Sequence, residues 1–224
     1  MGLDMYLKRY PRYRHCTAND IDVVSSYLDY LERPAEYAQD TLEQWCGVRD
    51  DELPSSAIIE HFKPYFTTKY YYWDDEHDYP HKYIAEQIGY WRKANAIHQW
   101  FVDNVQDGED DCDYHREVTE EDLIALRDLC VDVINHSPMA LGKIQNGWSC
   151  GPDGEIQKHL EDGKYVIDPS YAAEHLPTHH GFFFGNEEYN QWYIADLLET
   201  IKICNEVLDT TDFNTQMIYY LSSW

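Results

Sequence analysis

Basic residues are scarce in this chain. Its 224 residues include 17 Lys and Arg against 42 Asp and Glu, which gives a formal net charge of −25 at pH 7. A surface of this sign repels nucleic-acid phosphates and anionic lipid headgroups, whereas it attracts a basic protein groove. The composition therefore argues against direct nucleic-acid or membrane-surface binding and favours a basic protein as the partner.

Long apolar runs and cysteine motifs are also missing. No stretch approaches the roughly 20 residues of a membrane-spanning helix, and the opening MGLDMYLKRYPRYRH lacks the apolar core of a secretory signal. The six cysteines are widely spaced and none forms C-x-x-C. We therefore expect a cytoplasmic protein with reduced thiols, no disulfide framework and no metal held by cysteine.

Familiar catalytic and metal-binding signatures are absent as well. There is no G-x-S-x-G and no glycine-rich phosphate loop. The acidic segment 107–113 places Cys112 and Val118 where an EF-hand loop requires Gly and Glu. His77 and His81 are four residues apart, but no third ligand is evident. We predict no catalytic residue, no metal and no cofactor, although active sites that assemble in three dimensions leave an enzyme open as a third alternative.

What the chain does have is aromatic content. Aromatic residues make up 15% and hydrophobic residues 43%, which distinguishes it from disordered acidic chains. We predict a single domain over residues 1–224 with an α+β fold, mainly helical, and a small sheet in which the N- and C-terminal strands could pair. The expected strands are 3–10, 164–168 and the end of the chain; the expected helices are 17–31, 35–46, 81–106, 119–133, 169–175 and 186–208; and 137–163 is expected to form turns.

The segment 81–106 has the most regular apolar spacing, which predicts one long, mostly buried helix. Its inward-facing residues are expected to be Ile84, Ile88, Trp91, His98 and Val102. On the helix 17–31, Ile21, Val24, Tyr27, Leu28 and Leu31 are expected to share one face, and Asn186 is expected to cap the helix that follows it.

The same segment carries the candidate ligand site. His98 and Asn95 are polar residues in an apolar row, so they either hydrogen-bond within a core or line a cavity. Cationic side chains beside aromatic rings can bind a phosphate and stack a base. The candidate ligand-binding residues are Trp91, Arg92, Lys93, Asn95, His98 and Trp100. A satisfied core histidine beside a solvated Arg–Lys pair is the alternative interpretation.

Residues 62–80 mix aromatic residues with acids and two prolines. They are expected to form an insertion or an extended interface segment, because aromatic anchors among carboxylates suit a basic partner. The candidate interface residues are Tyr71, Tyr72, Trp73, Asp74, Asp75, Glu76 and Asp78. An edge strand with a polar flank is the alternative.

Several segments have a distinctive sequence. They are GLDMYL at 2–7, GYWRKANAIHQWFVDNVQ at 89–106, the pair Asp111-Cys112, NGW at 146–148, LPTHHGFFFGNEEYNQWY at 176–193 and YYLSSW at 219–224. Together they resemble a family of uncharacterised bacteriophage and prophage proteins; residues 11–80 match no such segment. The resemblance implies an accessory protein in the cytoplasm of a bacterial host and transfers no activity.

These observations predict a protein that binds and neutralises a host factor through an acidic, aromatic-dotted surface, in the manner of a nucleic-acid mimic. Spread over the roughly 10,700 Å² expected for this mass, the charge is about fourfold more dilute than on DNA, so the carboxylates would have to gather on one face. The alternative is a small-nucleotide-binding, sequestering protein with a pocket around Trp91–Trp100, which a deep pocket lined by those residues would favour.

Overall fold

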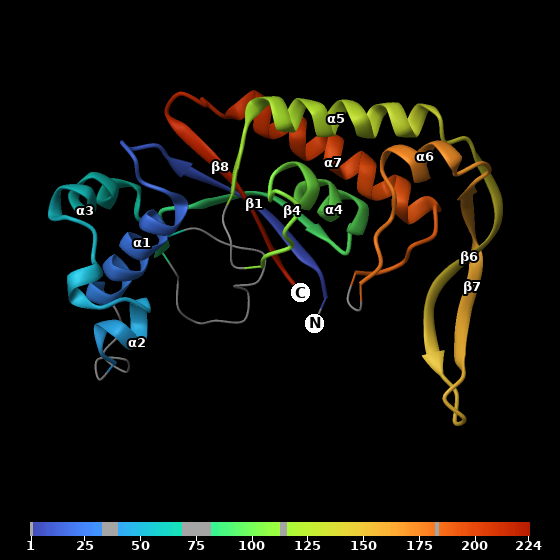
Figure 1. The fold of residues 1–224 in the computed structure, drawn as a ribbon, viewed down its shortest axis with the longest axis horizontal. Coiled ribbons are helices and arrows are strands. Elements are labelled where there is room, and N and C mark those ends of the chain that lie inside the picture. Colours follow the sequence, from blue (N-terminus) through green and yellow to red (C-terminus); the bar gives the residue numbers. More distant parts are fainter. Residues whose placement is uncertain (1, 33–39, 69–81, 113–115, 182–183) are drawn as a thin grey trace. The chain divides into compact units, whose positions relative to one another are not determined.

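The structure is a computed structural model that describes residues 2–32, 40–68, 82–112, 116–181 and 184–224 (Figure 1). Its strands are β1 (Asp4–Pro11), β2 (Thr67–Thr68), β3 (Lys82–Tyr83), β4 (Glu86–Arg92), β5 (Arg116–Val118), β6 (Met139–Cys150), β7 (Ile156–Val166) and β8 (Gln216–Ser223). Its α-helices are α1 (Ala18–Glu32), α2 (Leu42–Cys46), α3 (Ser56–Phe62), α4 (Asn95–Asn104), α5 (Glu120–Asn135), α6 (Ser170–His175) and α7 (Gln191–Thr210). Short 3₁₀ helices, η2 (Asp50–Glu52) and η3 (Lys63–Tyr65), complete the described elements.

A four-stranded sheet joins the beginning and the end of the sequence. Its strand order is β4-β1-β8-β5, so β1 pairs with β8. Four consecutive residues of β8, from Met217 to Tyr220, are buried. A strand buried on both faces reads as a continuous apolar run. The α+β fold and the pairing of the N- and C-terminal strands are both confirmed.

The chain divides into two compact units. Unit 1 comprises Met1–Tyr6, Gly89–Thr211 and Tyr220–Trp224, and unit 2 comprises Leu7–Ile88 and Asp212–Tyr219. The expectation of a single domain over residues 1–224 stays a prediction.

Unit 2 has its own hydrophobic core, which is built around α1. Ile21, Val24 and Leu28 recur at helical spacing and are buried. Tyr10 and Phe62 pack in the same cluster. The predicted face was wrong at Leu31, whose side chain is 60% exposed because it lies in the last turn of α1, three residues beyond the last buried position.

Unit 1 is organised by the packing of α5 against α7, which lie side by side in Figure 1. The predicted helix start at Thr119 is confirmed, because the Thr119 hydroxyl accepts from the Asp122 backbone N–H while the Asp122 carboxylate accepts from the Thr119 N–H. The start of α7 differs from the prediction. Its cap is Asn190 rather than Asn186, because the Asn186 side chain instead accepts from the Glu188 N–H and closes a turn.

The prediction of one helix over 81–106 is wrong. The chain forms the strands β3 and β4 and then turns into α4. Lys93 has a φ of +61°, a left-handed conformation that no continuous helix tolerates. Burial alternates at the end of β4, where Gly89 and Trp91 are buried and Tyr90 between them is only partly buried. The apolar residues that predicted one helix over 81–106 therefore belong to a strand and to the helix that follows it. Of the five residues expected to face inward, Ile88 alone is only partly buried.

The interpretation of 137–163 as turns is also wrong. These residues form most of a long antiparallel hairpin in which Met139 pairs with Val166 and Cys150 with Ile156. A glycine that suggested a turn lies within the hairpin instead. Gly147 has a φ of +86° at the shift in strand register between Gln145 and Trp148, where a left-handed backbone favours glycine. The expected strand 164–168 is the end of β7, and the helix expected at 169–175 is confirmed as α6.

Other predictions fall partly outside the described residues. Of the helix expected at 35–46, the structure describes α2 alone. Of the segment 62–80, it describes η3 and β2, and the candidate interface residues 71–76 and 78 lie outside the described residues. All six cysteines are free thiols. Within the described ranges, no helix is both long enough and apolar enough to cross a bilayer.

Candidate ligand pocket

A pocket of about 350 Å³ lies in unit 1. Its wall comes from the β4–α4 junction (92–97), the strand β6 (145–147), Thr178 with residues between 185 and 190, and the first turns of α7 (192–197). Pockets of this size suit small ligands. Segments from distant parts of the sequence therefore meet around one cavity.

One side of the wall is cationic and has an unusual backbone. Lys93 has a positive φ, and its backbone N–H donates to the Leu3 carbonyl at 2.7 Å. Gly185, itself at φ +95°, passes so close that an added Cβ would lie 3.0 Å from the Lys93 Cβ. Next to it, the Arg92 Nε lies 3.8 Å from the Asp4 carboxylate. Strained backbone of this kind is concentrated at functional sites, so the conformation of Lys93 supports a functional role for this wall.

The N-terminus of α4 opens into the same pocket. Its N-cap residue is Ala94, which provides no side-chain hydrogen bond to the first turn. Ala96 and Ile97, whose backbone N–H groups belong to that turn, both line the pocket. An uncapped helix N-terminus presents donors and a partial positive charge, which together attract anions.

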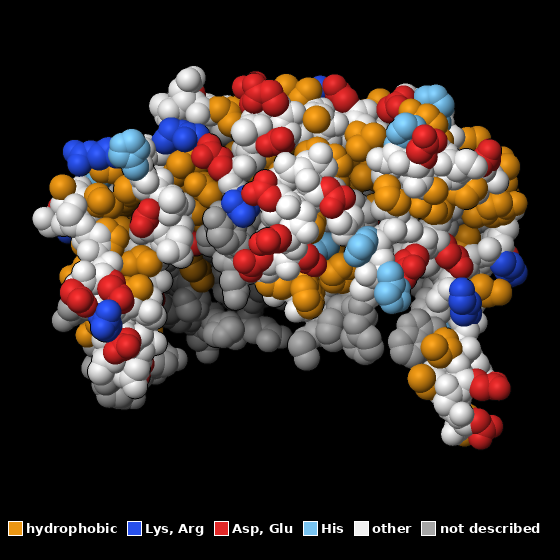
Figure 2. Space-filling model, viewed as in Figure 1, with side chains coloured by type: hydrophobic (Ala, Val, Ile, Leu, Met, Phe, Trp, Pro, Cys, Tyr) orange, Lys and Arg blue, Asp and Glu red, His pale blue; other side chains and the backbone are white. Residues whose placement is uncertain are grey.

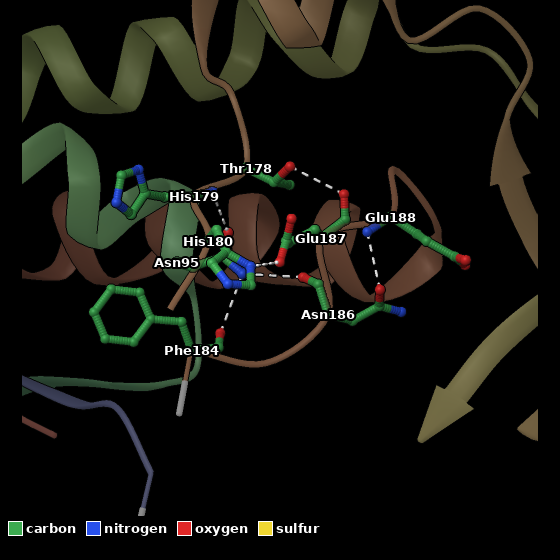
Figure 3. Close-up of polar contacts among 8 residues, drawn as sticks. All are labelled: Asn95, Thr178, His179, His180, Phe184, Asn186, Glu187 and Glu188. Carbon is green, nitrogen blue, oxygen red and sulfur yellow. Dashed lines mark hydrogen bonds and ion pairs between the residues drawn. The ribbon is translucent and has the colours of Figure 1, made fainter. Parts of the chain in front are cut away.

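Asn95 fixes the opposite loop rather than offering its side chain to a ligand. Its Nδ2 donates to the carbonyls of Phe184 at 3.1 Å and Asn186 at 3.0 Å, while its Oδ1 accepts from the His179 N–H at 3.0 Å (Figure 3). Thr178 and Glu187 tie the two arms of the same loop together through a 3.0 Å hydrogen bond. Both amide hydrogens of Asn95 are therefore committed, and the residue shapes the pocket.

The cap of α7 contributes an unsatisfied donor. The Asn190 Oδ1 accepts from the Trp192 N–H at 2.9 Å, which fixes the orientation of the amide. The Asn190 Nδ2 is buried and has no hydrogen-bond partner among the residues that the structure describes, and the residue is only 1% exposed. A buried donor without a partner is costly, so its presence in a pocket wall indicates a place for a ligand acceptor.

Two further residues of α7 face the pocket from one side of the helix. Trp192 is half-exposed and Asp196 follows it by one turn. Burial alone raises the pKa of the Asp196 carboxyl to about 7, and neither Arg92 nor Lys93 contributes. No described side chain or backbone group hydrogen-bonds to this carboxyl. The pocket therefore has a side that carries Arg92 and Lys93, the half-exposed Trp192, and two carboxyl groups, those of Glu188 and of the partly buried Asp196.

The structure brings together half of the predicted ligand-binding residues. Arg92, Lys93 and Asn95 line the pocket, whereas Trp91 and Trp100 do not. Trp91 is buried outside the pocket wall, where its Nε1–H donates to the Thr200 hydroxyl at 2.9 Å, and Trp100 packs edge-on against Phe101.

His98, the remaining candidate, is fully buried outside the pocket wall. Its Nδ1 lies 2.7 Å from the Tyr220 hydroxyl, and its Nε2 lies 3.2 Å from an Asp110 carboxylate oxygen. Burial lowers the pKa of His98, against the opposing effect of Asp110, so the ring is neutral near pH 7. His98 is therefore a core histidine, as in the alternative interpretation, but only its Nδ1 is hydrogen-bonded within the described residues, because the buried Nε2 approaches Asp110 without hydrogen-bond geometry.

Sequence reasoning missed Asn190, Trp192 and Asp196. Asn190 and Trp192 lie within the segment 176–193, which the sequence predicted to be partly helical. The one sequence signal for Asn190 was that an Asn directly before an apolar helical row is a typical helix N-cap. Among the described residues, no group of three His, Cys, Asp or Glu side chains is placed to hold a metal ion. Comparison with protein-family models, curated proteins and solved structures finds no match for this chain.

Proposed function

We propose that this protein binds a small phosphorylated ligand of the nucleotide class in the unit 1 pocket. The observation that carries the proposal is the buried Asn190 Nδ2, a donor without a partner in a pocket that α4 enters with an uncapped N-terminus. Arg92 and Lys93 add positive charge at the same wall.

An anion should bind at this wall because several electrostatic interactions favour it at the same place. The first-turn N–H groups of α4 attract an anion, and the helix dipole adds to this attraction. The N-cap residue of α7, Asn190, lies in the same wall, where its Oδ1 already accepts from the Trp192 N–H, so α7 contributes the Asn190 amide rather than a free helix end. The lining also contains two acidic residues, Glu188 and Asp196, so the attraction for an anion is local to the part of the wall formed by Arg92, Lys93 and the N-terminus of α4.

The aromatic wall explains why the ligand is a nucleotide rather than phosphate alone. Trp192 lines the pocket and is 48% exposed, and an indole ring that stays accessible beside a ligand can stack on a planar ring. The volume of about 350 Å³ accommodates one small nucleotide. In this proposal the protein acts by binding the nucleotide, which removes it from solution and so sequesters it.

The test is calorimetric titration of the protein with GMP, AMP and inorganic phosphate. In Asn190→Ser the hydroxyl keeps the capping acceptor for Trp192, but the amide Nδ2–H is lost and the O–H of the shorter side chain does not replace it at the same position, so affinity for all three should fall about tenfold. Asn190→Asp also keeps the acceptor and adds a negative charge, so binding should fall further.

A matched control is Lys202→Gln, which removes an exposed cation of α7 outside the pocket. This variant should bind like the unaltered protein, because only charge within the pocket wall contacts the ligand. Equal losses in Lys202→Gln and Asn190→Ser, or no binding by the unaltered protein, would contradict the proposal.

A second candidate function rests on the net charge: binding of a basic host protein through an acidic surface. On the face shown in Figure 2, acidic side chains of unit 1 occur over α5, near α4 and at the tip of the β6–β7 hairpin, with other atoms between them. A nucleic-acid mimic requires denser charge, so we place this candidate second. Its test is the association rate with a captured host protein, which should fall with salt and with charge reversal at Asp74, Asp75 and Glu76 but not in Asn190→Ser.

The biological setting is proposed from the resemblance. The segments that resemble bacteriophage and prophage proteins support an accessory protein that acts in the cytoplasm of a bacterial host. Sequestration of a host nucleotide is compatible with that setting, and it needs no catalytic residue.

A further inference from the structure

The carboxyl of Asp196 identifies the other end of the ligand. It lines the pocket, the residue is only partly exposed, burial raises the pKa of its carboxyl, and no protein group within the described residues donates a hydrogen bond to it. A desolvated carboxylate without donors is unfavourable, and a ligand that supplies N–H groups would satisfy it.

The spacing along α7 relates this carboxyl to the anion-binding end. Asn190 and Asp196 are six residues apart, which corresponds to about 9 Å along the axis at about 1.5 Å per residue. Trp192 lies between them and on the face of Asp196, because residues four apart lie above one another. A ligand that spans the pocket thus meets, in order, a phosphate donor, a stacking surface and a carboxyl.

We propose that the pocket selects a guanine nucleotide, whose phosphate lies at Asn190 and the N-terminus of α4, whose base stacks on Trp192, and whose N1–H and 2-amino group donate to the Asp196 carboxylate. The inference rests on the proposed function, because it assumes that the phosphate occupies the anion-binding end.

Guanine is chosen by its hydrogen-bonding edge. A carboxylate accepts hydrogen bonds through two oxygens and is best satisfied by two neighbouring donors. Guanine presents the N1–H beside the 2-amino group. Adenine and cytosine each place an unprotonated ring nitrogen beside their amino group, and uracil flanks its N–H with two carbonyl oxygens, so all three set an acceptor against the carboxylate.

The experiment compares GMP, IMP, AMP and inorganic phosphate by calorimetry at pH 8, where Asp196 is ionised, in the unaltered protein and in Asp196→Asn. IMP differs from GMP only by the missing 2-amino group. The unaltered protein should bind GMP about tenfold to a hundredfold more tightly than IMP, as expected for loss of one donor of a bidentate pair. Asp196→Asn should erase this preference while it leaves phosphate affinity unchanged or slightly higher.

The guanine assignment and the proposed function fail on different outcomes. If phosphate and all nucleotides bind, lose affinity in Asn190→Ser, and yet show equal GMP and IMP affinities, the guanine assignment is overturned and the anion site stands. If Asp196→Asn retains the GMP preference, Asp196 is not the selecting group and the assignment is likewise overturned. If nothing binds, the proposed function itself fails. Because Asn has nearly the size of Asp, unchanged circular dichroism of the variant separates a binding effect from misfolding.

Discussion

Replacing Asp196 by Asn should make the unliganded protein more stable near neutral pH. Burial raises the pKa of this carboxyl from 3.8 to about 7, and each unit of difference between the folded and unfolded states corresponds to about 1.4 kcal/mol. The ionised carboxyl therefore costs the folded state about 4 kcal/mol at pH 8, and an amide of the same shape avoids that cost.

The sign and the pH range follow from the direction of the change. Because the folded-state pKa lies above the unfolded one, the carboxyl opposes folding least below pH 3.8, where it is protonated in both states. Its stabilising contribution is lost as the pH rises from about 4 to about 7. The advantage of Asp196→Asn should thus be about 2 kcal/mol at pH 5.5 and about 4 kcal/mol at pH 8.

Urea unfolding followed by far-ultraviolet circular dichroism at the two pH values measures both quantities. Asp209→Asn is the matched control, because Asp209 is an exposed acid on the same helix, and its effect should stay below about 0.5 kcal/mol at either pH. If Asp196→Asn is no more stable than the unaltered protein at pH 8, the carboxyl is hydrogen-bonded or well solvated, and Asp196 is not the unsatisfied acceptor that a guanine base would need.

Three further predictions concern stability and reactivity. Thr119→Ala should lower the free energy of unfolding by about 1 kcal/mol, whereas Ser55→Ala should have little effect, because the Ser55 side chain makes no capping hydrogen bond; urea unfolding of both variants measures this. Tyr220→Phe should cost about 1–3 kcal/mol, because it leaves the buried His98 Nδ1 without its partner. An unfolding midpoint in urea equal to that of the unaltered protein would refute the prediction for Tyr220→Phe. Denatured protein should show six thiols on titration, while in the native protein the exposed Cys150 should react first; a count of two or fewer would contradict the assignment of reduced thiols.

The sequence predicted the fold best where a local signal and the tertiary structure agree. The cap at Thr119 is completed within the first turn of α5, and the apolar residues of α5 recur at helical spacing, so local reasoning suffices to predict this helix. It failed at 81–106, where the same apolar spacing is compatible with a strand followed by a helix. The deciding feature was the conformation of Lys93, which depends on contacts with Leu3 and Gly185 that no local pattern contains.

The candidate site was predictable only in part for a similar reason. Arg92, Lys93 and Asn95 attract attention because they are polar residues in an aromatic segment. Asn190 and Asp196 become informative only through burial, which leaves one without an acceptor and the other without a donor. Missing hydrogen-bond partners of this kind arise only when segments distant in the sequence fold together, so no local sequence pattern predicts them.

The strand order of the main sheet has a consequence for how the protein is made. β8 lies between β1 and β5, and it is the last of these four strands to leave the ribosome. Until then β1 has an unpaired edge and β5 has no neighbour in the sheet. Nascent chains with exposed strand edges are prone to aggregate and are held by chaperones. The sheet must therefore close after translation of β8, and a chain interrupted before that strand would be directed to degradation rather than to function.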